Sequence, residues 1–160
     1  MADNDPRPTA TSADLEWVRR PLADLRAAID ALEEASAAPA ASRTAEWSMA
    51  VHEALVDLGA AFERHIAATE GPDGLHDRIR DAAPRLSIHV DRMAAEHRAT
   101  RQAITEAVDA AREGSRSADP ELPEQVRERV NDLVRRLLEL RGHGADLIYE
   151  AYEVDIGAGD

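Results

Sequence analysis

Residues 44–70 read TAEWSMAVHEALVDLGAAFERHIAATE, and this stretch decides the fold of the 160-residue chain. Its apolar residues recur every three or four positions, which is the spacing of one face of an α-helix. That face consists of Trp47, Val51, Leu55, Leu58, Phe62, His65 and Thr69. The sequence Gly-Pro-Asp-Gly follows at 71–74 and predicts a firm helix end. We therefore expect a long amphipathic helix whose buried face has a histidine and a threonine as its last two residues.

Three other stretches have the same spacing. Their apolar faces are Leu15, Val18, Leu22, Leu25, Ile29 and Leu32; Leu86, Val90, Met93, His97, Thr100 and Ile104; and Val126, Val130, Leu133, Leu137, Leu140, Leu147 and Ala151. Pro21 predicts a break or kink in the first of these helices. Loops are expected at 35–42 and 114–120, and a short helical turn at 75–81. No run of alternating β-branched residues indicates a strand.

Four long helices joined by short loops predict an all-α fold, an up-down-up-down four-helix bundle. We expect one domain over residues 13–157, because this length is sufficient for a single hydrophobic core. Residues 1–12 are polar, contain two prolines and are expected to be disordered. They show no signal-peptide pattern, and no apolar run approaches the roughly 20 residues that span a bilayer. A cytoplasmic location is the resulting expectation.

Charge and composition exclude several classes of function. The net charge is −13, from 32 acidic residues and 19 basic residues, all of them arginine. A negative surface repels nucleic acids and anionic membranes, so neither is an expected partner. The chain has no cysteine, which excludes disulfides, thiolate nucleophiles and Cys-ligated metals. There is no Gly-rich phosphate loop and no Glu-x-x-His pair, and we do not predict an enzyme.

Two histidines lie where a helical core is normally apolar. His65 and His97 both fall on the inward faces of their helices. Burying an imidazole is unfavourable unless another group bonds it, and inward polar groups on separate helices form metal and ligand sites in bundles. Two interpretations stay open for each histidine: a hydrogen-bonded core residue or a metal ligand.

Other candidate groups lie near these faces. Glu70 follows His65 by five residues, which turns it about 140° away on a regular helix. Glu96 lies beside His97 at the edge of its face. The group Glu139, His143, Asp146 and Glu150 shares one face that is offset from the core and is expected to be exposed. His52 and His76 are expected at the surface, and the position of His89 stays open.

From Phe62 onward the chain resembles the hemerythrin-like, or HHE cation-binding, domain family. The resemblance rests on FERH at 62–65, TEGPDGL at 69–75, APRL at 83–86, AEH at 95–97, LRGHGADLIYEAY at 140–152 and DIG at 155–157. The resemblance covers residues 44–157. Within the family, the chain is similar to a bacterial branch with a degenerate ligand set. The family is a four-helix bundle with a non-haem di-iron centre. The resemblance implies a metal-ligand set of His65, Glu70, Glu96, His97 and His143.

The ligand pairs of that family are incomplete here. The first helix has no histidine, and the residues four positions after His65, His97 and His143 are Thr, Arg and Leu. We therefore expect a reduced or lost metal site, with one or two iron ions or none, in a small binding or sensing protein. The alternatives are a functional iron protein that binds or senses O2, NO or peroxide, and a structural partner-binding bundle. Monomer and dimer both stay open.

Overall fold

The structure is a computed structural model that describes residues 15–152. Its elements are α1 (Glu16–Ala37), α2 (Thr44–Glu70), α3 (Leu75–Ala82), the 3-10 helix η2 (Pro84–Leu86), α4 (Ser87–Gly114) and α5 (Leu122–Tyr152). The described residues contain no strand. The segment 1–12, for which disorder is expected, lies outside the described residues, as do the ends of the expected domain at 13–14 and 153–157.

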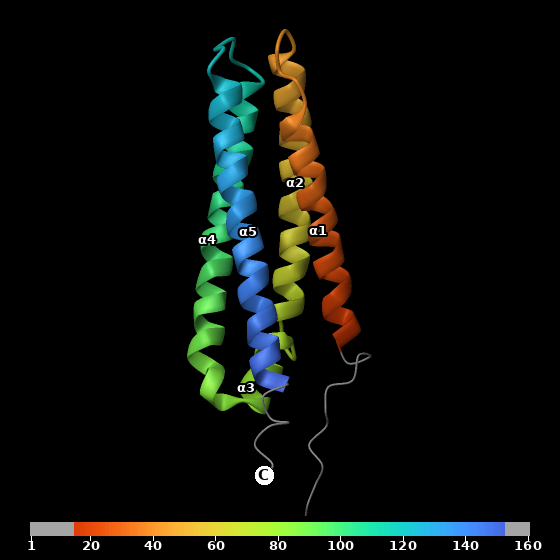
Figure 1. Cartoon of the computed structure of the whole chain (residues 1–160), viewed down its shortest axis with the longest axis vertical. Helices are drawn as coiled ribbons and strands as arrows, with labels where there is room; N and C mark the ends of the chain where they lie inside the picture. Colours follow the sequence, from red (N-terminus) through yellow and green to blue (C-terminus); the bar gives the residue numbers. More distant parts are fainter. Residues whose placement is uncertain (1–14, 153–160) are drawn as a thin grey trace, which may run out of the picture.

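The four long helices α1, α2, α4 and α5 run up, down, up and down along one axis (Figure 1), which confirms the all-α bundle. Neighbours in sequence pack side by side, α1 on α2, α2 on α4 and α4 on α5, whereas α1 and α5 touch only sparsely. The short helix α3 lies across the end of the bundle where α1 begins and α5 ends (Figure 1). Within residues 15–152, every helix is too short or too polar to traverse a lipid bilayer.

The predicted buried faces of α2, α4 and α5 are confirmed. Every position named for these three faces is buried, including the two histidines and both threonines. On α1, the predicted residues Val18, Leu25, Ile29 and Leu32 are buried, whereas Leu15 and Leu22 are half-buried. The helical spacing of apolar residues is therefore a reliable guide to the core of this bundle.

Of the break or kink predicted at Pro21, the break is wrong, because α1 continues through this residue, and the kink stays a prediction. Pro21 lies in the second turn of the helix, so its missing N–H removes one backbone hydrogen bond close to an end that already lacks partners. The loop expected at 35–42 is also shorter than predicted, because α1 extends to Ala37. Ser36, in this last turn, is a buried polar residue that the apolar pattern did not indicate.

The turn between α2 and α3 is unusually tight. A Cβ on Gly71 would lie 2.4 Å from the carbonyl oxygen of Ala67, and one on Gly74 would lie 2.6 Å from the carbonyl oxygen of Gly71. Asp73 adopts a φ of 57°, in the left-handed region that Asp tolerates better than most residues. This close approach of backbone to backbone reverses the chain, so that α3 folds back onto the end of the bundle.

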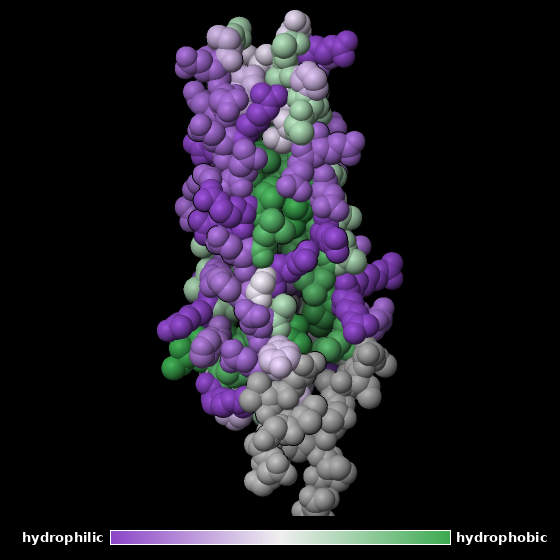
Figure 2. Space-filling view, viewed as in Figure 1, coloured by the Kyte–Doolittle hydropathy of each residue, from purple (hydrophilic) through white to green (hydrophobic). Residues whose placement is uncertain are grey.

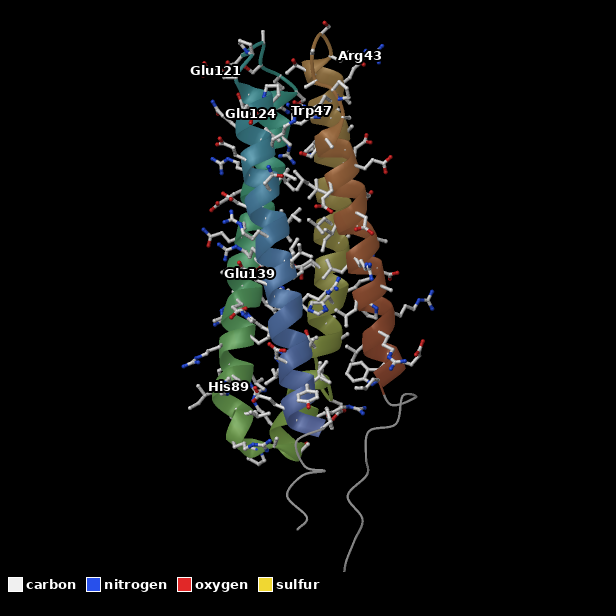
Figure 3. The ribbon with its side chains drawn as sticks, in the orientation of Figure 1. Arg43, Trp47, His89, Glu121, Glu124 and Glu139 are labelled. Atoms are coloured by element: carbon white, nitrogen blue, oxygen red, sulfur yellow. The ribbon has the colours of Figure 1, made fainter. Side chains whose placement is uncertain are left out.

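Two separate hydrophobic clusters make up the interior. The larger one includes Trp47, Phe62 and Leu137. It extends along the four long helices from the end of the bundle that carries the α1–α2 and α4–α5 loops. Trp47 lies near that end (Figure 3). The Arg127 guanidinium lies 4.9 Å from the centre of its ring and donates hydrogen bonds to carbonyl oxygens of Ser36 and Ala38. The smaller cluster lies at the α3 end and consists of Val18, Leu75, Ile79, Ala83, Leu86, Val90, Leu147 and Ala151.

Candidate functional site

A cavity of about 380 Å³ lies between the two hydrophobic clusters. Leu25, Leu137 and Leu140 contribute to its wall from the larger cluster, and Ile79 and Leu147 contribute from the smaller one. The other apolar lining residues include Val18, Leu22, Leu75, Met93 and Ile148. The polar lining residues of the interior are His65, Thr69, His76 and His97. The cavity therefore has apolar walls and one polar side.

Three imidazole rings form that polar side. The ring centres of His65 and His97 are 5.2 Å apart and nearly perpendicular, and those of His76 and His97 are 5.6 Å apart and nearly parallel. Their exposed fractions are only 9 %, 4 % and 2 % for His65, His76 and His97. Phe62 supports two of the rings, with its centre 6.0 Å from that of His65 and 5.8 Å from that of His97. The rings thus form one packed cluster.

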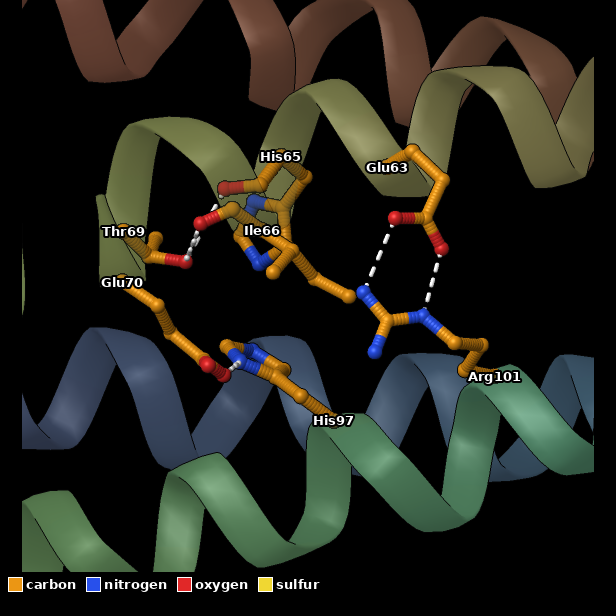
Figure 4. A network of polar contacts seen from close by, with 7 residues as sticks. All are labelled: Glu63, His65, Ile66, Thr69, Glu70, His97 and Arg101. Atoms are coloured by element: carbon orange, nitrogen blue, oxygen red, sulfur yellow. Dashed lines mark hydrogen bonds and ion pairs between the residues drawn. The ribbon is translucent and has the colours of Figure 1, made fainter.

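Glu70 reaches this cluster from the end of α2. His97 Nδ1 on α4 donates a 2.5 Å hydrogen bond to Glu70 Oε1 (Figure 4). Glu70 points about 140° away from His65 on a regular helix, and it still takes part in the cluster because it contacts the histidine of the neighbouring helix. With the Nδ1 proton directed at the carboxylate, the other ring nitrogen of His97, Nε2, is left as an acceptor.

His65 has an unused polar atom. Its Nδ1 is buried and has no hydrogen-bond partner among the described residues. The nearest inward hydroxyl, that of Thr69, instead donates to the backbone carbonyl oxygens of His65 and Ile66 at 2.9 and 3.2 Å (Figure 4). A buried ring nitrogen without a partner is unfavourable, and a bound molecule can supply that partner.

All three rings are neutral at neutral pH. Burial lowers the pKa of His65 and of His76 to about 4, and repulsion from His97 lowers both further. Burial also lowers the pKa of His97, although the hydrogen bond to Glu70 opposes this shift. A neutral imidazole offers one donor and one acceptor. The polar side of the cavity can therefore hydrogen-bond to an uncharged polar group without bringing a charge into the core.

The surface position predicted for His76 is wrong. His76 is buried and lies against His97, because the tight 71–74 turn folds α3 onto the end of the bundle. The surface prediction for His52 is also inaccurate, since this residue is half-buried and its Nε2 has no access to solvent. His89, whose position was open, is exposed on α4 (Figure 3).

Two residues of the implied ligand set lie elsewhere. His143 Nδ1 is 2.9 Å from Glu96 Oε2, in a groove of about 280 Å³ on the outer side of α4 and α5. That hydrogen bond raises the pKa of His143. The exposed face predicted from Glu139 to Glu150 is confirmed. The structure thus brings His65, Glu70 and His97 together, and leaves Glu96 and His143 outside as a separate surface pair.

The residues do not fit a di-iron centre. Among residues 15–152, no three His, Asp or Glu side chains are placed to hold one metal ion. His97 Nδ1 is engaged by Glu70, and the nearby Glu63 pairs with Arg101 through contacts of 2.6 and 2.8 Å (Figure 4). In di-iron carboxylate bundles the facing helices all contribute carboxylate or imidazole donors, and the described part of α1 supplies none to this cavity.

The cavity opens to the surface between α1 and α5. Its outer lining includes Ala23 and Arg26 on α1, and Arg141, Gly144 and Ala145 on α5. Apolar side chains are visible along this seam (Figure 2). A Cβ built on Gly144 meets no atom within 4 Å. The small side chains on both sides leave the space between these two sparsely contacting helices unfilled, and this space is the mouth.

No family model, no curated protein and no solved structure matches this chain. What the arrangement can do chemically is to enclose an apolar molecule and offer it hydrogen bonds from neutral imidazoles.

Proposed function

We propose that this protein binds a small, largely apolar molecule inside the bundle, in the cavity beside His65, His76 and His97. The observation that carries the proposal is a cavity of about 380 Å³ with apolar walls and a few converging polar groups on one side. Ligand sites in proteins commonly have about 300–1,000 Å³ and this same composition. The unpartnered Nδ1 of His65 is the expected hydrogen-bond partner of the ligand.

The experiment that tests this proposal uses three uncharged molecules, octan-1-ol, 4-ethylphenol and indole, each with an apolar body and one polar group. Titration calorimetry on the full chain is expected to detect binding of at least one of them. In the variant Gly144→Leu, the added side chain occupies the open space at the mouth, and we expect binding to weaken about tenfold or more, which is about 1.4 kcal/mol.

The matched control is Gly142→Leu. Gly142 lies on the same helix and a Cβ there also meets no atom, but this residue does not line the cavity. Both variants remove a helical glycine, so both should gain about 0.5–1 kcal/mol in the free energy of unfolding. If both variants weaken binding equally, the cavity is not a ligand site and a partner-binding bundle becomes the better hypothesis.

The relation to hemerythrin-like proteins is part of the proposal. It is supported by the up-down-up-down order of the long helices and by the inward positions of His65 and His97 on α2 and α4. We infer a scaffold of that kind in which the interior serves a small molecule in place of a metal centre. The absence of three suitably placed metal donors among the described residues supports the loss of the di-iron centre.

Elemental analysis tests the metal part directly. The untagged protein, produced in medium supplied with iron and zinc, is expected to contain no stoichiometric metal and to remain folded. About two iron ions per chain, the content of a di-iron centre, would contradict the proposal and favour the oxygen, nitric oxide or peroxide function. One metal ion per chain would point to a reduced site around His65 and His97.

A further inference from the structure

We infer that the ligand of this cavity is an amphipathic monocarboxylate, whose carboxylate is held at the mouth by Arg26 of α1 and Arg141 of α5. The inference rests on the proposed function and names the class of its ligand. The apolar chain of the monocarboxylate would extend inward from the mouth. A hydroxyl or carbonyl group near the far end of that chain would meet the imidazoles.

The charges at the cavity support an anionic ligand. The chain as a whole carries 32 acidic and 19 basic side chains. Among the described residues that line the cavity, none is Asp or Glu, and two are arginines. The groove on the outer side of α4 and α5 has the opposite character, since Glu96, Asp146 and Glu150 all line it. A cavity that lacks acidic groups in so acidic a protein is electrostatically suited to an anion.

The two arginines are available to a ligand. Arg26 and Arg141 are both exposed, and within residues 15–152 neither forms an ion pair or a side-chain hydrogen bond. They lie on the two helices that border the mouth. Guanidinium groups bind carboxylates through paired, charge-assisted hydrogen bonds, which are stronger than bonds between neutral groups.

The chemistry of the cavity also sets the orientation of the ligand. A carboxylate placed beside His65 would lose its hydration in an apolar interior where all three imidazoles are neutral. At the mouth, the same carboxylate keeps contact with water and gains the two guanidinium groups. The apolar walls then enclose the chain, and the unpartnered Nδ1 of His65 is left for an uncharged polar group.

The test compares two probes of equal length, 8-hydroxyoctanoate and octane-1,8-diol, together with their six- and ten-carbon homologues. Both carry the far hydroxyl group, and only the first carries a carboxylate. By calorimetry on the full chain, we expect the best acid to bind about tenfold more tightly than the diol of the same length. This preference should decrease at high salt, because ions screen an exposed charge pair.

The double variant Arg26→Gln/Arg141→Gln is expected to lose the preference and to bind acid and diol with equal affinity, because it removes both guanidinium groups from the mouth. The control Arg20→Gln/Arg136→Gln removes two exposed arginines from the same helices that do not line the cavity, and it should keep the preference. Equal binding of acid and diol by the natural chain would overturn this inference and leave the proposed function standing. Failure of the acids, the diols and the uncharged molecules alike would overturn both.

Discussion

Lowering the pH from about 7 to about 5 is expected to reduce the free energy of unfolding by about 2 kcal/mol for each of His65 and His76. Both side chains are buried and neutral, with a pKa near 4 in the folded protein. In the unfolded chain the pKa returns to 6.5. His97 should add an effect in the same direction, since its pKa is also lowered.

The sign follows from where the protons bind. Between the folded and the unfolded pKa, the unfolded chain takes up a proton that the folded chain does not, so acid favours unfolding. The contribution of these groups is complete above about pH 6.5 and is lost as the pH falls towards 4. The charges that act on His76 are Glu70, Asp77 and Arg80, and the two carboxylates favour its protonation whereas the arginine opposes it. Glu70 and Glu96 favour protonation of His97, and Arg101 opposes it. Denaturant unfolding at a series of pH values measures the effect.

Two histidine variants separate this effect from general acid denaturation. His76→Leu removes one buried titrating group, so the loss of stability between about pH 7 and pH 5 should shrink by about 2 kcal/mol. His89→Leu, on the exposed surface of α4, should leave the slope unchanged. If the natural chain and His76→Leu lose stability in parallel, the imidazole cluster is not buried in the neutral form.

The second large effect is expected from Phe62→Ala, which should lower the free energy of unfolding by about 3–5 kcal/mol. Phe62 is fully buried and belongs to the larger hydrophobic cluster. It also packs against the rings of His65 and His97, so its removal leaves a void directly beside the polar side of the cavity. Denaturant unfolding at neutral pH is the measurement.

Val56→Ala is the matched control for this prediction. Val56 lies on the same helix, but 48 % of its surface is exposed, and its replacement should change the stability by no more than about 0.5 kcal/mol. A loss of less than about 1 kcal/mol for Phe62→Ala would mean that the helices collapse around the missing ring. The histidine cluster would then be less firmly packed than its geometry indicates.

Much of this bundle can be predicted from the sequence, because helical spacing reflects burial directly. The faces of α2, α4 and α5 carry their apolar residues at intervals of three and four, and those residues are buried. His65 and His97 belong to these faces, so their inward positions were predicted as well. Pro21 shows the limit of local rules, since a residue that breaks a helix interior is tolerated in the second turn.

The rest of the site depends on how elements meet, which local patterns do not encode. His76 lies on an eight-residue helix whose position is set by the 71–74 turn. Glu70 at the end of α2 contacts His97 on the neighbouring helix α4, although the two residues are 27 positions apart in the sequence. The pairing of His143 with Glu96 depends in turn on how α4 and α5 are rotated against each other. The cavity itself has no signature in the sequence beyond small residues such as Gly144.

The helix α3 gives this bundle a part that can change independently. It is eight residues long and is connected to α2 through the 71–74 turn. It supplies Leu75, His76 and Ile79 to the lining of the cavity. Substitutions there would alter the size and polarity of the bound molecule while the contacts among the four long helices stay intact. Ligand preference could therefore diverge in evolution through this short segment without a change in the packing of the long helices.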